Sequence, residues 1–292
     1  MTPSSSANNA CRKVFVEHPS TAVSIINCKE QDVIVCISLE KPVLQVEVIR
    51  EKNSLKARVP ADCPMSDDEI LSSIPLYVKN KYAIKIDRAR DLRGCGLLCS
   101  STCLSALSIG IAYSLYDNPL LAEQVACSIP EHKMLYRSLV LGGISFYTET
   151  PGKELVPTTF FPPPPALRVL IGYHKSLECH KAIDIVGGLE ALRGALSMLW
   201  EGDVPGSLEM LGRAAERIKC ENQSPLEREV RKLGLPLLPL REKGWFTVLV
   251  PLGEECSEEV EELGEKLFSI LSSYGVETYV TRVSAGGVIR IS

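Results

Sequence analysis

Long apolar runs and an excess of positive charge are both missing from this 292-residue sequence. No apolar segment reaches the roughly 18 residues that a membrane-spanning helix needs, and the opening MTPSSSANNA is too polar for a signal peptide. The 32 Lys and Arg against 36 Asp and Glu give a formal net charge of -4, which favours neither nucleic acid nor an anionic membrane. We therefore expect a cytoplasmic protein that binds neither.

Paired cysteine spacings are also absent, although the chain has eleven cysteines. Cys95, Cys99 and Cys103 repeat every four residues, and His and Cys residues gather at 174–180, but neither group offers four ligands at a zinc-site spacing. We expect no metal site of this kind. Small thiols that pack in the interior are the main interpretation, and disulfides stay open.

The first hundred residues are rich in β-branched and alternating apolar positions. This pattern predicts strands at 14–18, 32–40, 43–51 and 82–86, with a turn at Lys41-Pro42. Ser66 followed by Glu69 has the form of a capping box and predicts an amphipathic helix from residue 66 to about residue 80.

Residues 96–116 are small and apolar on nearly every side, which predicts a buried central helix ending at Asp117-Asn118-Pro119. A short helix is expected at 119–127, and Gly142-Gly143 leads into a strand at 144–149. The stiff run Phe161-Pro162-Pro163-Pro164-Pro165 is the candidate boundary between two lobes.

The rest of the chain alternates strands and helices. The expected strands are 167–174, 245–252 and 276–283, and the expected helices are 184–201, 205–220 and 255–273. This order predicts a ferredoxin-like sandwich. The whole is then an α+β protein with a disordered tail at 1–10, a β-rich N-terminal lobe at 11–160 and a second lobe at 166–292.

The segment GCGLLCSSTCLSAL at 94–107 places glycine and hydroxyl side chains at the entry of the predicted buried helix. A helix N-terminus offers backbone N–H groups and the positive end of the helix dipole to a phosphate. Small side chains also permit tight helix packing, so a phosphate site and a purely structural entry both fit this pattern.

These residues resemble the phosphate-binding loop of the GHMP family of small-molecule kinases, in the form GLASSAAGFAAL of the mevalonate-diphosphate decarboxylase branch. Residues 96–107 align with it without a gap, although Leu98 and Cys99 are bulkier than the family residues. The resemblance implies a nucleotide-binding set, namely Gly96, Leu97, Cys99, Ser100, Ser101 and Thr102.

Two more segments resemble motifs of this branch. STAVSIINCKEQD at 20–32 resembles SNIAVIKYWGKRD, which implies that Lys29 is a catalytic-site charge for a substrate phosphate. MLYRSLVLGGISFY at 134–147 resembles ACRSLFGGFV, which implies that Arg137 and Ser138 bind substrate.

The last such segment, EKGWFTVLVPL at 242–252, has the pattern of the branch's DAGPNAVLFTL. It places Glu242 at the position of the catalytic aspartate. The aspartate base that other GHMP kinases carry has no counterpart, because no acidic residue lies between Lys133 and Gly143. The four segments follow one another in family order.

The resemblance implies a two-lobed GHMP-kinase-like fold that uses ATP and Mg²⁺ to transfer a phosphoryl group to a small hydroxylated acid. The implied activity is most like that of a mevalonate (di)phosphate decarboxylase. Two alternatives stay open: a non-catalytic GHMP-fold protein that binds a ligand or partner, and a GHMP kinase for homoserine or shikimate. The sequence leaves both a monomer and a homodimer open.

Overall fold

The computed structural model describes most of the chain in separate stretches, which are 11–26, 32–94, 99–118, 121, 142–149, 156–175, 177, 182–183, 185–220, 222–240, 243–251, 258–286 and 290–291. The chain divides into two compact units. Unit 1 comprises residues 1–20, 42–139 and 288–292, and unit 2 comprises residues 21–41 and 140–287. Strand β1 (Arg12–Ile26) begins in unit 1 and ends in unit 2, and strand β2 (Asp32–Arg50) begins in unit 2 and ends in unit 1.

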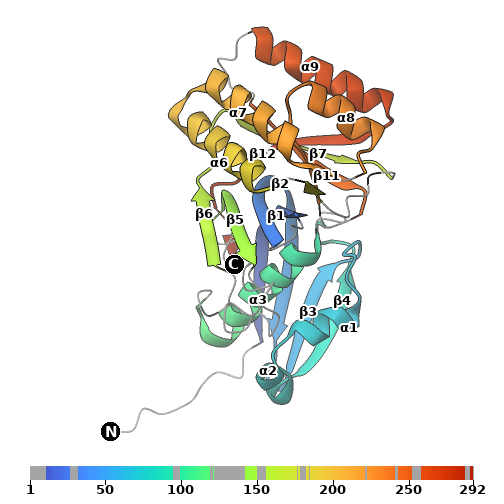
Figure 1. Ribbon diagram of the computed structural model, residues 1–292. Coiled ribbons are helices and arrows are strands. Elements are labelled where there is room, and N and C mark those ends of the chain that lie inside the picture. The colour runs from blue at the N-terminus through green and yellow to red at the C-terminus, as the bar shows by residue number, and fades with distance from the viewer. Residues whose placement is uncertain are drawn as a thin grey trace. The chain divides into compact units, whose positions relative to one another are not determined.

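Unit 1 is built on strands in the order β13-β1-β2-β3-β4, of which Figure 1 labels β1 to β4. The further strands are β3 (Ser54–Pro60), β4 (Ala83–Ala89) and β13 (Arg290–Ile291). β2 and β3 are antiparallel, whereas β3 and β4 are parallel. The connection between these parallel strands holds helices α1 (Asp67–Ser73) and α2 (Leu76–Lys81), as a parallel pair requires a crossover.

Helix α3 (Cys99–Tyr116) packs its side chains into the core of unit 1. The strands supply alternate residues to this core, because successive side chains of a strand point to opposite faces. Gly110 lets the helix approach closely, since a Cβ there would lie 2.7 Å from a methyl of Val48. The expected buried helix is confirmed over residues 99–116, and the start predicted at Gly96 lies outside the described residues.

The single helix expected between residues 66 and 80 is wrong, because α1 and α2 are separate helices. Ser66 and Glu69 form the expected capping box at the start of α1. The helix then stops at Ile74, whose ψ of 129° is extended. Pro75 explains the break, because a proline disfavours helical backbone at the residue before it, and Pro75 itself becomes the N-cap of α2.

The expected turn at Lys41-Pro42 is also wrong, because β2 runs through both residues. Pro42 lacks an N–H group, yet its carbonyl oxygen accepts a hydrogen bond of 2.7 Å from the Ser20 hydroxyl. The N–H of Lys41 donates to the Thr281 hydroxyl over 3.0 Å. Side-chain partners thus satisfy polar backbone groups at this position, and the strand continues.

Strand β3 is not among the strands predicted from the sequence.

Unit 2 contains an antiparallel sheet in the order β10-β11-β7-β12, with helices packed over it in Figure 1. Its strands are β7 (Leu167–Tyr173), β10 (Leu237–Pro239), β11 (Trp245–Pro251) and β12 (Glu277–Arg282). Its helices are α6 (Ile185–Glu201), α7 (Val204–Arg217), α8 (Pro225–Lys232) and α9 (Glu258–Ser273). When these four strands are numbered by their order along the chain, their order in the sheet is 2-3-1-4, which is that of a ferredoxin-like sheet. The expected α+β fold class is therefore confirmed.

Unit 2 also contains β5 (Ile144–Glu149) and β6 (Val156–Phe161), which pair antiparallel with each other. β5 pairs in addition with residues 32–37 of β2. The run of four prolines follows β6 and leads to β7, so it lies within unit 2. A minor two-stranded sheet joins β8 (Ala182–Ile183) to β9 (Lys219–Cys220). Among the helices in the described ranges, none combines the length and the apolar character that crossing a membrane requires.

Candidate functional site

The first turn of α3 is the part of the predicted phosphate loop that the structure describes. The backbone of Cys99, Ser100 and Ser101 is helical, so the N–H groups of this first turn have no carbonyl partner earlier in the helix. Such a turn, at the positive end of the helix dipole, is suited to bind an anion. Thr102 is fully buried, one residue further on.

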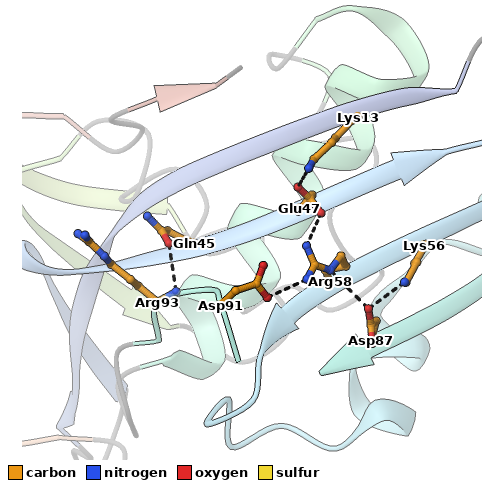
Figure 2. Close-up of polar contacts among 8 residues, drawn as sticks. All are labelled: Lys13, Gln45, Glu47, Lys56, Arg58, Asp87, Asp91 and Arg93. Atoms are coloured by element: carbon orange, nitrogen blue, oxygen red, sulfur yellow. Dashed lines mark hydrogen bonds and ion pairs between the residues drawn. The ribbon is translucent and has the colours of Figure 1, made fainter. Parts of the chain in front are cut away.

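The chain that leads toward this helix is attached to β2 through Gln45, as Figure 2 shows. The backbone N–H of Gln45 donates to the carbonyl oxygen of Arg93 over 2.9 Å, and the Arg93 N–H donates to the Gln45 side-chain oxygen over 3.1 Å. The amide nitrogen of Gln45 donates in turn to Glu17 over 2.7 Å. One glutamine thus fixes the backbone that precedes the loop and is itself oriented by a carboxylate.

A buried carboxylate lies on the same face of β2, two residues from Gln45. Glu47 is only 3% exposed, and it accepts from Lys13 over 2.6 Å and from Arg58 over 2.7 Å. Burial alone would raise the pKa of Glu47, but the hydrogen bonds from Arg58 and Lys13 outweigh it and hold the pKa below its usual value. Glu47 is therefore ionised at neutral pH.

The ion pairs continue from Glu47 across β3 to β4 (Figure 2). Arg58 also contacts Asp91 over 2.8 Å and Asp87 over 3.4 Å, and Asp87 pairs with Lys56 over 2.9 Å. Hydrogen bonds from Arg58 to Glu47 and Asp91 raise the pKa of the guanidinium above its usual value. Because carboxylates already surround Arg58, this network serves to join the strands and does not offer a cation to a ligand.

Helix α3 also contacts a buried histidine of β1. His18 is 0% exposed, and its Nδ1 lies 2.8 Å from the carbonyl oxygen of Pro19, while its Nε2 lies 3.4 Å from the Ser105 hydroxyl. Burial lowers the pKa of His18 to about 4, against a smaller raising effect of the Pro19 hydrogen bond. A neutral ring with the proton on Nδ1 fits both contacts, because Nδ1–H then donates to Pro19 and Nε2 accepts from Ser105.

In unit 2, the glycine pair after the predicted substrate segment has backbone angles that require glycine. Gly142 and Gly143 have φ of 71° and 66°. Gly143 donates to the carbonyl of Ser284 over 2.8 Å and accepts from the N–H of Ser38 over 3.0 Å. A Cβ on Gly142 would lie 2.7 Å from the backbone nitrogen of Gly286. The pair is thus a tightly packed turn into β5.

The segment that carries Glu242 connects β10 to β11. The N–H of Leu240 donates to the carbonyl of Trp245 over 2.8 Å, which closes the base of this connection. Gly244 has a φ of 81°, and a Cβ there would lie 2.7 Å from the Tyr173 ring. The glycine-containing turn expected before this strand is therefore present, while Glu242 itself lies outside the described residues.

Most of the predicted site residues fall outside the described part of the chain. These are Lys29, Gly96, Leu97, Arg137, Ser138 and Glu242, together with the side chains of Cys99, Ser100 and Ser101. Their roles stay predictions. The functional arrangement that sequence reasoning missed is the attachment of Arg93 to Gln45, and no local pattern around Gln45 signals it.

Family models and curated proteins give no match to this chain, but solved structures do. A homoserine kinase from Cytophaga hutchinsonii aligns with a TM-score of 0.53 and 15% identity over 100% of both chains. A mevalonate-3-kinase from Thermoplasma acidophilum, with mevalonate 3-phosphate and ADP bound, has a TM-score of 0.56 and 9% identity over 94% of this chain and 96% of its own. A phosphomevalonate kinase from Streptococcus pneumoniae has a TM-score of 0.50 and 10% identity over 94% and 99%. At such low identities the likeness concerns the fold alone, and the fold of this chain is that of the GHMP-family kinases.

Proposed function

We propose that this protein transfers a phosphoryl group from ATP to a small hydroxylated acid. The observation that carries the proposal is the start of α3, where a helical first turn follows a segment attached to β2 and the sequence resembles the GHMP phosphate loop. The N–H groups of that turn suit a nucleotide phosphate. The GHMP-kinase fold supports the same activity, because its solved examples include small-molecule kinases.

In this proposal each predicted residue has a distinct task. Ser100 and Ser101 donate hydrogen bonds to the nucleotide phosphates, and Lys29 and Arg137 bind the negative charges of the substrate, with Ser138 beside Arg137. Glu242 orients the substrate hydroxyl or accepts its proton. Mg²⁺, when bound with ATP, supplies charge neutralisation at the phosphates.

The finer proposal is that the acid is a mevalonate derivative, phosphorylated at its 3-hydroxyl. The three further sequence motifs at 20–32, 134–147 and 242–252 support this branch. A Thermoplasma mevalonate-3-kinase shares the fold and binds mevalonate 3-phosphate with ADP. In the decarboxylase branch the new phosphate then leaves as carbon dioxide is lost. Homoserine is the second candidate substrate, because the homoserine kinase aligns over the whole of both chains.

The test is a substrate panel with Mg-ATP and the full chain. Mevalonate, its 5-phosphate, its 5-diphosphate, homoserine and shikimate are assayed separately for ADP release and for carbon dioxide. ADP with carbon dioxide from one mevalonate derivative is expected for the decarboxylase, and ADP alone defines a kinase of the substrate that gives it. If no compound gives ADP and ATP does not raise the unfolding temperature, the enzyme proposal fails and a non-catalytic binding protein replaces it.

Paired serine variants of α3 test the predicted phosphate contacts. The double variant Ser100→Ala/Ser101→Ala should lower kcat/KM about 100- to 10,000-fold, because each of the two hydrogen bonds to a charged group contributes about 1.5–3 kcal/mol. Ser114→Ala is the matched control, since its hydroxyl donates to the Ile111 carbonyl within the same helix, over 2.8 Å. Equal losses in both variants would contradict a phosphate role for Ser100 and Ser101.

A further inference from the structure

The outer strand β12 of the unit 2 sheet has an open edge. In the strand order β10-β11-β7-β12, β12 pairs with β7 on one side, and no strand in the described ranges pairs with the other side of residues 277–282. β2 reaches only the far end, where Leu39 forms an isolated bridge with Val283. Edge strands present unpaired N–H and C=O groups, which natural proteins protect by short length, proline, charge or a covering segment.

The opposite edge of the same sheet has such protection. β10 is three residues long and ends in Pro239, whose carbonyl oxygen accepts a hydrogen bond of 2.6 Å from the Ser24 hydroxyl. The middle of β12 reads Thr-Tyr-Val-Thr at 278–281, without a proline or a charge. Tyr279 and Val280 are 38% and 40% exposed, and they lie on opposite faces because neighbouring side chains of a strand alternate. At these two residues β12 is therefore uncovered on both faces.

The hydrogen bonds of β7 determine which backbone groups of β12 face inward. The N–H of His174 donates to the carbonyl oxygen of Gly244 over 2.8 Å, in continuation of the pairing between β7 and β11. The even-numbered residues of β7 therefore face β11, and its odd-numbered residues face β12. Tyr279 lies opposite Ile171 in the pairing of β12 with β7. The odd-numbered residues of β12 thus exchange hydrogen bonds with β7.

The outward backbone groups of β12 belong to its even-numbered residues, of which Thr278 and Val280 lie in the open part. The N–H of Ser284, further along the same parity, donates outward to the carbonyl oxygen of Ser38 on β2 over 2.8 Å. This bond independently confirms the outward direction. Beside Thr278 and Val280 the described residues place no strand, so the N–H and C=O groups of both residues are available to a further strand.

We propose that β12 pairs antiparallel with β12 of a second copy of this chain, about a two-fold axis at Tyr279. In this register Thr278 lies opposite Val280 of the second copy, and the two residues exchange both of their hydrogen bonds. The two-fold axis repeats this pair, so every outward group of Thr278 and Val280 is used. Tyr279 lies opposite its own counterpart as a non-hydrogen-bonded pair, in which the side chains come closest. The two sheets then become one continuous sheet.

Charge complementarity favours a second copy as the occupant of this edge. The register about Tyr279 places Glu277 of the second copy opposite Thr281. The Thr281 hydroxyl accepts from the N–H of Lys41 over 3.0 Å, so the exposed Lys41 lies beside that position. Glu277 is itself exposed, and an acid therefore meets a base at both ends of the paired strands. A register shifted to Val280 lacks this match and runs into the end of β12 that β2 already covers.

Sedimentation and light scattering of the full chain over a range of concentrations test the pairing. We expect twice the chain mass at high concentration and dissociation on dilution. Val280→Pro removes an outward N–H and no hydrogen bond to β7, so this variant should stay folded and be a monomer where the unaltered chain is a dimer. Val280→Ala is the matched control, because it keeps the N–H and should still form the dimer. Circular dichroism and thermal unfolding verify that both variants are folded.

Charge reversal tests the register and does not depend on the folding of the proline variant. Glu277→Lys brings a lysine to Lys41 of the other copy and should raise the dimer dissociation constant about 10-fold. The double variant Glu277→Lys/Lys41→Glu should restore the original value. The proposal is overturned if Val280→Pro dimerises as strongly as Val280→Ala, or if charge reversal leaves the dissociation constant unchanged. A monomer at every concentration of the unaltered chain also overturns it and leaves the edge to solvent or to a different chain.

Discussion

Gln45 and Arg93 exchange two hydrogen bonds, one through the backbone N–H of Gln45 and one through its side-chain oxygen, at 2.9 and 3.1 Å. Gln45 lies on β2, near the middle of the unit 1 strand order, while Arg93 comes shortly before α3. The glutamine side chain thereby acts as an additional backbone partner. The direction in which the chain enters the predicted phosphate loop depends on it.

Replacing this side chain should loosen the loop entry. Gln45→Ala removes one hydrogen bond to Arg93 and the one to Glu17, and we expect a loss of about 1–2 kcal/mol in the free energy of unfolding. Hydrogen exchange of the peptide containing Arg93 should become faster, and ATP affinity should fall in proportion if the proposed site is correct. Lys56→Met, on the same face of the sheet, is the control, since its ion pair is with Asp87. Unchanged exchange at Arg93 would contradict this role.

His18 should make the protein less stable in mild acid. The folded pKa is about 4 and the unfolded reference value is 6.5, so the unfolded chain binds more protons between these values. The contribution of His18 to stability is complete above pH 6.5 and is lost as the pH falls toward 4, by up to about 1.4 kcal/mol per pH unit.

Urea unfolding at several pH values, with and without His18, measures this effect. His18→Phe keeps the ring volume and removes the titration, so its curve of stability against pH should be flatter than that of the unaltered chain between pH 6.5 and 4. Parallel curves over this range would show that His18 does not become protonated on unfolding. Ser105→Ala retains the histidine and should keep the steeper dependence.

Glu47 should matter far more than the exposed acids around it. Glu47→Ala leaves Lys13 without its partner and deprives the half-buried Arg58 of a hydrogen bond, and we expect a loss of about 2–3 kcal/mol in the free energy of unfolding. Asp87→Ala is the control on the same network, and its effect should be small because water screens this carboxylate, whose side chain is 35% exposed. Equal changes in urea midpoint would mean that burial of Glu47 adds nothing to its ion pairs.

Arg231 joins α8 to the end of α7. Its guanidinium donates to the carbonyl oxygens of Ala215 and Ile218 and pairs with the buried Glu227 over 2.6 Å. Arg231→Met deprives these carbonyl oxygens of their donor and the buried Glu227 of its ion pair, although the Cys220 N–H still donates to Glu227 over 3.0 Å. We expect a loss of about 3–5 kcal/mol in the free energy of unfolding.

The control for Arg231 is another helical ion pair with the same spacing. Arg213 pairs with Glu209 over 2.5 Å on the exposed side of α7, and Arg213→Met should leave the unfolding midpoint nearly unchanged. Thermal and urea unfolding of the two variants give the comparison. A loss in Arg213→Met as large as that in Arg231→Met would assign the effect to helix propensity, not to the buried contacts.

The elements that local sequence rules predict well are those in which one local force dominates. The strand at 144–149 and the capping box of Ser66 are confirmed, and so is the helix over 99–116. The errors at Lys41-Pro42 and at Ile74 have opposite causes. At Pro42 the predicted turn is wrong because side chains distant in sequence satisfy the backbone groups of β2. At Pro75 the predicted continuous helix is wrong because the proline ends α1 at Ile74.

Within the candidate site, the sequence by itself determined the small-residue entry to α3, the glycines of the turns and the order of the motifs. These depend on backbone conformation and side-chain size, which act over a few residues. Only the tertiary structure decided that Gln45 holds Arg93 and that Glu47 is buried between two cations. Through strand pairing, these contacts join residues that lie between 11 and 48 positions apart in the sequence. The register of strands and the burial of charge are collective properties, so no local pattern specifies them.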